Sequence, residues 1–206
     1  MRAPGQVRID VFTAFNNTAI EVCEGQQYDM NFENRKEVSI DEFIKMIRLK
    51  TAVLVAVSLK IGAMIARADI KDADTIYQFG ENLGIAFQLR DDLLDVFSDE
   101  KKFGKTTGGD IVENKKTFLF LKALELADQK QKAELLDLFS TNTENPEEKI
   151  SAVKNLYETL QIREHTNSEI DKYYRKAMEH LKNISIPDHR KSELLGFAGR
   201  LKQRES

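Results

Sequence analysis

The spacing of apolar residues predicts helices along almost the whole chain. Within residues 73–97, apolar side chains recur every three or four positions and form two stripes on one helix. Stretches of the same period predict further helices over about 8–32, 39–66, 117–127, 129–139, 146–160, 162–182 and from 188 to the C-terminus. In few stretches do apolar and polar residues alternate one by one, as they do in β-strands. The chain is therefore expected to be all-α.

Local signals mark where some of these helices begin. Ser39 and Glu42 have the spacing of a capping box, and Asn145 precedes a proline at the first helical position. The core stripe expected of the helix after Ser39 consists of Phe43, Ile47, Lys50, Leu54, Val57 and Ile61. A lysine in an apolar stripe has two explanations. The Lys50 ammonium either reaches past the stripe to the surface or points into a polar cavity.

A line of polar residues runs between the two apolar stripes of residues 73–97. Gly84, Gln88, Asp91 and Asp95 fall on it at positions i, i+4, i+7 and i+11. An Asp-Asp-x-x-Asp string on the surface of a helix is the ordinary case. Carboxylates between two apolar stripes, however, are expected to face the interior of a helical assembly, where they need positive partners.

A segment rich in glycine and lysine follows this helix. Residues 103–117 include Lys105 and Lys115. Carboxylates suit hard divalent cations, and ammonium groups suit anionic oxygens. Together they predict a site for a metal-bound phosphate compound.

Composition narrows the class of protein. The 206 residues carry a net charge of −3, with both signs interleaved, which excludes a basic nucleic-acid-binding surface. The single cysteine, Cys23, excludes an intramolecular disulfide and favours a reducing cytoplasm. The most apolar run, residues 52–66, contains Ser58 and Lys60 and is short for a membrane span. One domain over residues 1–206 is the expectation.

Four short motifs follow one another along the chain. Residues 25–29 read Gly-Gln-x-x-Asp, residues 50–52 read Lys-Thr-Ala, and residues 87–95 hold the aspartates. Residues 104–115 contain Gly-Lys, then Gly-Asp-Ile, then a further lysine. This series resembles the trans-type polyprenyl diphosphate synthases over about residues 18–117. The resemblance implies the all-α helical bundle of the isoprenoid (terpenoid) synthases.

The resemblance also implies roles for individual residues. The implied site residues are Asp91, Asp92 and Asp95 for Mg²⁺; Lys50, Lys105 and Lys115 for the allylic diphosphate; Lys50, Thr51 and Gln88 for catalysis at the developing allylic cation; and Gln26 and Asp29 in support. The implied reaction condenses isopentenyl diphosphate with an allylic prenyl diphosphate by Mg²⁺-assisted ionisation. A homodimer is implied as well, across the first helix, whose apolar face carries Phe12, Phe15, Ala19 and Val22.

The sequence departs from this family in one respect. The family carries two aspartate-rich motifs, and the first would lie upstream of residue 25, but this sequence holds only the second. We therefore expect the C-terminal portion of a synthase, without its N-terminal helices and inactive alone. The alternative is a non-catalytic partner subunit that modulates a full-length synthase. A terpene cyclase or condensing enzyme of the same fold is a third option. The intact aspartates and lysines favour the catalytic origin.

Overall fold

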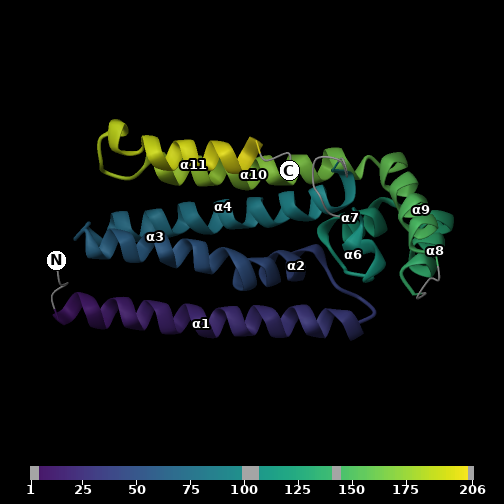
Figure 1. The fold of residues 1–206 in the computed structure, drawn as a ribbon, viewed down its shortest axis with the longest axis horizontal. Coiled ribbons are helices and arrows are strands. Elements are labelled where there is room, and N and C mark those ends of the chain that lie inside the picture. Colours follow the sequence, from purple (N-terminus) through teal and green to yellow (C-terminus); the bar gives the residue numbers. More distant parts are fainter. Residues whose placement is uncertain (1–4, 99–106, 141–144, 204–206) are drawn as a thin grey trace. The chain divides into compact units, whose positions relative to one another are not determined.

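The all-α prediction is confirmed. The computed structural model describes residues 5–98, 107–140 and 145–203, and every regular element within these ranges is a helix (Figure 1). The elements are α1 (Gly5–Asn34), α2 (Ile40–Ile47), the π-helical η1 (Arg48–Ala52), α3 (Val53–Ile65), α4 (Ile70–Phe97), α6 (Gly109–Val112), α7 (Phe118–Leu126), α8 (Gln129–Leu138), α9 (Pro146–Thr159), α10 (Ile162–Lys182), the 3₁₀ turn η2 (Asp188–Arg190) and α11 (Ser192–Gln203). The predicted last helix is thus interrupted near its start.

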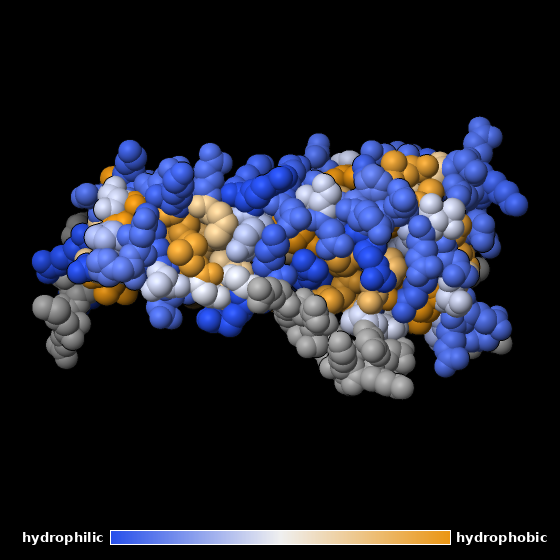
Figure 2. All heavy atoms as spheres, turned by 90° about the horizontal axis from the view of Figure 1, so that it is seen from above, coloured by the Kyte–Doolittle hydropathy of each residue, from blue (hydrophilic) through white to orange (hydrophobic). Residues whose placement is uncertain are grey.

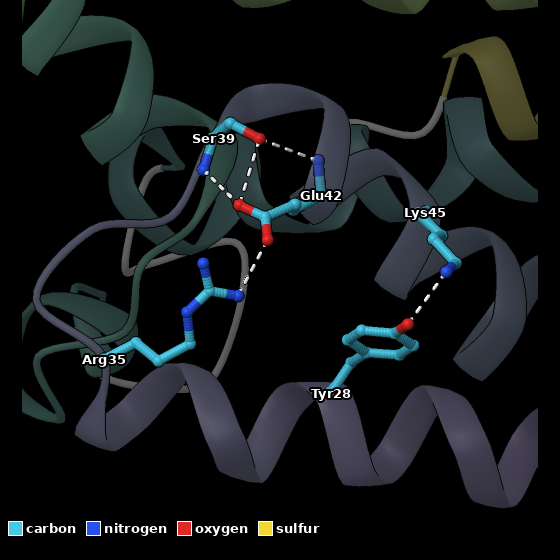
Figure 3. A network of polar contacts seen from close by, with 5 residues as sticks. All are labelled: Tyr28, Arg35, Ser39, Glu42 and Lys45. Carbon is cyan, nitrogen blue, oxygen red and sulfur yellow. Dashed lines mark hydrogen bonds and ion pairs between the residues drawn. The ribbon is translucent and has the colours of Figure 1, made fainter.

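The capping box predicted at Ser39 is present. The Glu42 N–H donates to Ser39 Oγ at 3.2 Å, and the Ser39 N–H donates to Glu42 Oε2 at 3.0 Å (Figure 3). Arg35 adds an ion pair to Glu42 at 2.7 Å, which together with the Ser39 N–H lowers the pKa of Glu42 from 4.5 to about 2. These bonds satisfy backbone donors at the start of α2 that have no partner within the helix.

The helical run from Ile40 to Ile65 contains a π-helical turn at η1. The predicted core stripe is wrong at Leu54, which is 49% exposed. Phe43, Ile47 and Val57 are nevertheless buried as predicted.

The described residues form two compact units, and three long helices, α1, α4 and α10, run through both. Of the described residues, the first unit comprises 5–29, 45–88 and 171–203, and the second comprises 30–44, 89–98, 107–140 and 145–170. Each unit is described by itself below. The expectation of a single domain stays a prediction.

In the first unit, η1 and α3 lie between α1 and α4 (Figure 1). Glycines allow the close approach on both sides: a Cβ on Gly25 of α1 would come within 2.4 Å of Lys50 N, and one on Gly84 of α4 within 2.6 Å of Ala52 Cα. Lys45 Nζ also donates to the Tyr28 hydroxyl of α1 at 2.8 Å (Figure 3). The close helix packing therefore places the Lys-Thr-Ala motif directly against its neighbours.

The other side of α4 packs on the C-terminal helices of the first unit. Phe79 and Leu83 form an apolar cluster with Ala177 and Leu181 of α10 and Ala198 of α11. Ser185 N–H donates to Asp72 Oδ1 at 2.9 Å and ties the turn after α10 to the start of α4. Hydrophilic residues cover most of the face that α10 and α11 present to solvent (Figure 2).

In the second unit, α9 packs on the short α6 and on α7 and α8, and α7 also packs on α8. The rings of Phe120 and Phe139 lie 4.1 Å apart between centroids, and Leu119, Leu135, Val153 and Tyr157 are buried almost completely. Of the helices that the structure describes, none has the length and apolar character of a membrane span. The cytoplasmic location stays a prediction.

Candidate functional site

Lys50 pairs with Asp29 in the first unit. Its ammonium lies 2.6 Å from Asp29 Oδ2, and the two side chains are 38% and 36% exposed. Gly25 makes this pair possible, because it lets α1 approach the backbone of Lys50. The structure therefore brings together two of the predicted residues. Gln26, also predicted in support, is exposed on α1.

Thr51 and Gln88 form a second predicted pair in the same unit. Thr51 Oγ1 donates to Gln88 Oε1 at 3.1 Å, and both residues are partly buried. The two residues belong to η1 and α4, which approach closely because Gly84 has no side chain. Lys50 and Thr51 are consecutive, so their side chains point in different directions, and Lys50 contacts α1 while Thr51 contacts α4.

The three predicted metal residues differ in exposure within the second unit. Asp91 is exposed, Asp95 is partly buried, and Asp92 is only 6% exposed. The expectation that the whole line faces the interior is wrong for Asp91. Asp91 and Asp95 are four residues apart on one continuous helix, so their carboxylates lie about one turn apart on the same face.

Asp95 receives backbone donors from the start of α6. The Asp110 N–H donates to Asp95 Oδ2 at 3.0 Å, and the Gly108 N–H donates to the Asp95 carbonyl at 2.7 Å. Burial raises the pKa of Asp95 above its ordinary value, and the charge of Asp110 raises it further, while the Asp110 and Gly109 N–H groups and Lys115 oppose the shift. The segment that begins at Gly108 is therefore fixed at its start to the last aspartate of the motif.

Lys115 lies at the other end of this segment. Its ammonium is 2.9 Å from Asp110 Oδ1 and 2.8 Å from Glu113 Oε2. Partial burial works to lower the pKa of Lys115, but its bonds to Glu113 and Asp110 outweigh burial and raise the pKa above its ordinary value. The ammonium therefore stays charged and half-exposed.

Asp110 is the site residue that sequence reasoning missed. Its backbone binds Asp95 and its side chain binds Lys115, so it connects a predicted metal residue with a predicted phosphate residue. The signal was its place in the Gly-Asp-Ile motif, but spacing gave it no role. Lys105, the remaining predicted phosphate residue, lies outside the described ranges.

The donor set suits a magnesium ion that a phosphate compound completes. In the part of the chain that the structure describes, no three His, Cys, Asp or Glu side chains converge to hold a metal by themselves. Mg²⁺ is commonly bound by one or two carboxylates together with water and substrate phosphates. An exposed Asp91 one turn from Asp95 matches that mode of binding and does not match a cage of protein ligands.

Comparison with known proteins gives concordant results. The polyprenyl synthetase family model matches residues 3–159. The geranylgeranyl diphosphate synthase of Sulfolobus acidocaldarius is 36% identical over 195 residues, which are 95% of this chain and 57% of that protein. The short chain isoprenyl diphosphate synthase of Methanothermobacter thermautotrophicus is 33% identical over 176 residues, or 85% of this chain and 53% of that protein.

Solved structures show the same fold. One crystal structure of a geranylgeranyl pyrophosphate synthase superposes with a TM-score of 0.92 at 41% identity, over 98% of this chain and 63% of that chain. The geranylgeranyl pyrophosphate synthase of Corynebacterium glutamicum, solved with isoprenyl diphosphate and magnesium, gives a TM-score of 0.88 at 29% identity over 98% and 57%. The chain thus spans somewhat over half the length of the proteins it resembles.

Proposed function

Because this chain belongs to the polyprenyl synthetase family, we propose that it carries part of the active site of a prenyltransferase that joins isopentenyl diphosphate to an allylic prenyl diphosphate. The observation that carries this proposal is the contact series from Asp95 through Asp110 to Lys115, with Asp91 one turn away. This series supports the proposal because carboxylates suit a divalent cation and an ammonium group suits phosphate oxygens, and a metal-bound diphosphate needs both.

Residues of the second unit would act on the diphosphate. Asp91 and Asp95 would hold Mg²⁺, supported by Asp92, and the metal would supply Lewis-acid stabilisation of the leaving diphosphate. Lys115 would place its ammonium on phosphate oxygens, a step that exchanges Asp110 or Glu113 for the substrate. Lys105 would add a second ammonium. These fixed charges favour the state in which the C–O bond has broken.

Residues of the first unit would act on the allylic cation and, through Lys50, on the diphosphate. When the allylic C–O bond breaks, its electron pair leaves with the diphosphate and an allylic cation remains. Gln88 Oε1, already oriented by the Thr51 hydroxyl, would direct a carbonyl dipole at that cation. Lys50 would contact the diphosphate, and Asp29 and Gln26 would support it. The isopentenyl double bond then attacks the cation, and loss of a proton completes the condensation.

Binding tests the proposal on this chain directly. Calorimetric titration with pyrophosphate should show binding that depends on Mg²⁺, and the Asp91→Ala, Asp95→Ala double variant should lose most of it. Glu134→Ala removes an exposed carboxylate of α8 and is the control. Equal binding by the double variant and the unaltered chain would refute the metal assignment.

The chain by itself should not elongate prenyl diphosphates. Its sequence holds one aspartate-rich motif, whereas ionisation requires charge stabilisation from the motif that the resemblance places upstream. Loss of one preorganised contact alone typically slows turnover by about 10²–10³-fold. An assay with Mg²⁺, isopentenyl diphosphate and farnesyl diphosphate should yield no longer product, while a version extended through the first motif should. Elongation by this chain alone would contradict the proposal.

The partner subunit is the second candidate, and the single aspartate-rich motif is the observation that favours it. A partner would change the rate or the product length of a full-length synthase when the two are mixed. Inactivity of the extended version, together with such a change, would support the partner and overturn the catalytic proposal.

We also propose that the chain forms a homodimer through α1. One face of α1 packs on the first unit, with Thr18 and Gly25 buried. The outer face exposes large apolar side chains: Ile9 (61%), Phe12 (65%), Phe15 (52%) and Ile20 (59%). A cluster of large apolar side chains left exposed on one face of a helix marks an interaction surface. Light scattering at micromolar concentration should give twice the chain mass, and Phe12→Glu with Phe15→Glu should give the monomer. A monomeric unaltered chain would refute the dimer.

A further inference from the structure

A buried lysine contacts the residue that precedes Lys115. Lys149, in the first turn of α9, is 3% exposed. Its ammonium donates to Asn114 Oδ1 and lies 5.5 Å from the centre of the Phe139 ring. Burial lowers its pKa. A lysine is seldom buried unless specific contacts compensate for its lost hydration, and for Lys149 the contact with Asn114 provides such compensation.

Asn114 forms the turn that ends α6. It has a left-handed backbone, with φ +57°, which asparagine tolerates better than most residues. The Lys115 N–H donates to the Asp110 carbonyl at 2.9 Å, and the Asn114 N–H donates to the Ile111 carbonyl at 3.2 Å. This pair of bonds is a Schellman motif with Asn114 at its left-handed position. The conformation of Asn114 therefore sets the direction in which Lys115 leaves the helix.

The turn also fixes the Lys115 side chain. The chain reverses at Asn114, so the Lys115 ammonium comes back to Asp110 Oδ1 at 2.9 Å. Asp110 is bound in turn to Asp95 through its backbone. A shift of Asn114 would consequently change the position of Lys115 relative to both aspartates.

Helix α9 holds the other end of the segment as well. Lys154 Nζ donates to Thr107 Oγ1 at 3.2 Å. Gly108 has φ +89° and lies so close to Ile150 that a Cβ would come within 2.8 Å of its side chain. Residues 107–115 are thus anchored to α9 at both ends, by Lys154 and Ile150 at the start and by Lys149 at the end.

We propose that Lys149 is a positioning residue, which acts through Asn114 to hold Lys115 where a diphosphate would be bound. The role of Lys115 in binding rests on the proposed function above. The placement of Lys115 by Lys149 is a separate property of this chain and can be measured without any ligand.

The first experiment measures the reactivity of Lys115. Limiting amounts of an amine-acylating reagent are added, and the labelling rate of each lysine is followed by peptide mass spectrometry. Lys149→Met keeps the aliphatic stem and removes the donor, whereas Asn114→Gly keeps the left-handed turn and removes the acceptor. Both should label Lys115 roughly fivefold faster, about the effect of one hydrogen bond. Lys130→Met, an exposed lysine of α8, should leave the rate unchanged.

The second experiment is a double-variant cycle in pyrophosphate binding with Mg²⁺. Lys149→Met should weaken binding roughly fivefold in the unaltered chain and should have no effect in a Lys115→Ala background. A merely structural role would weaken binding equally in both backgrounds, which would overturn the proposal. Unchanged Lys115 labelling in both variants, with circular dichroism showing them folded, would also overturn it.

The outcomes separate this inference from the proposed function. If Lys149→Met fails to fold, Asn114→Gly carries the labelling test, because glycine suits a positive φ. Faster Lys115 labelling in a chain that binds no pyrophosphate would support the positioning by Lys149 and overturn the proposed function.

Discussion

Replacing Gly25 by alanine tests whether close helix packing holds the Lys50 motif in place. An added Cβ would lie 2.4 Å from Lys50 N and 2.8 Å from both Leu49 C and Lys50 Cα. These are backbone atoms, which cannot rotate away as the end of a side chain can. Helix α1 and η1 would have to separate by about 1 Å to restore ordinary contact near 3.4 Å.

Two opposing effects set the magnitude. Overpacking of this kind costs about 1–3 kcal/mol, whereas alanine in a helix is favoured over glycine by about 1 kcal/mol. We expect the steric term to win because three backbone atoms are involved, with a net loss of about 1–2 kcal/mol. For a chain of this length that lowers the melting temperature by about 2–8 °C.

Urea and thermal unfolding followed by circular dichroism provide the assay. Gly62→Ala in α3 is the matched control, since a Cβ there meets nothing within 4 Å. That variant should gain about 0.5–1 kcal/mol from helix propensity alone. If Gly25→Ala is as stable as Gly62→Ala, the two helices are not in the close contact that this reasoning requires.

Three further predictions concern helix starts and a turn. The pKa of Glu42 is depressed in the folded state, so its contribution to stability is present above pH 4.5 and is lost as the pH falls towards about 2. The difference in stability between the unaltered chain and Glu42→Gln should therefore shrink over that interval, and a constant difference would contradict the shift. Asp128→Ala removes the capping box of α8 and should cost about 1 kcal/mol in urea unfolding, with Asp128→Asn close to the unaltered chain; equal loss in both would argue against the cap. Gly108→Ala should destabilise the folded chain by more than 1 kcal/mol, because alanine is strained at a positive φ and its Cβ would clash with the Ile150 side chain. Unchanged stability would refute that contact.

The helices could be predicted because their signals are local. Period, caps and proline positions are properties of neighbouring residues, so α4, α9 and α10 begin and end within about three residues of their predicted bounds. The π-turn has no such local signal, because a helical turn with one additional residue has the same kind of amino-acid composition as a regular α-helical turn. The assumption of an uninterrupted α-helix was therefore wrong at Arg48–Ala52.

The site could be predicted only in part, because spacing gives the face of a helix and not its neighbour. The Lys50–Asp29 and Thr51–Gln88 pairs join residues 21 and 37 positions apart, and no periodicity predicts such contacts. Lys149 follows two glutamates in a first turn, where a charged residue is usually solvated, so nothing in the sequence marked it as buried.

The π-turn has a consequence for insertions and deletions. A single π-turn is geometrically an α-helix into which one residue has been inserted, and the turn absorbs that residue while the flanking helices keep their faces. Deleting one residue from Arg48–Ala52 should let the run close as regular α-helix with α2 and α3 still facing their neighbours. The same deletion within α3 would rotate the residues after it by about 100°. A shortened η1 would thus give a chain that folds, but in which the residues that remain from Arg48 to Ala52 change direction, so that the Lys50–Asp29 and Thr51–Gln88 contacts are weakened.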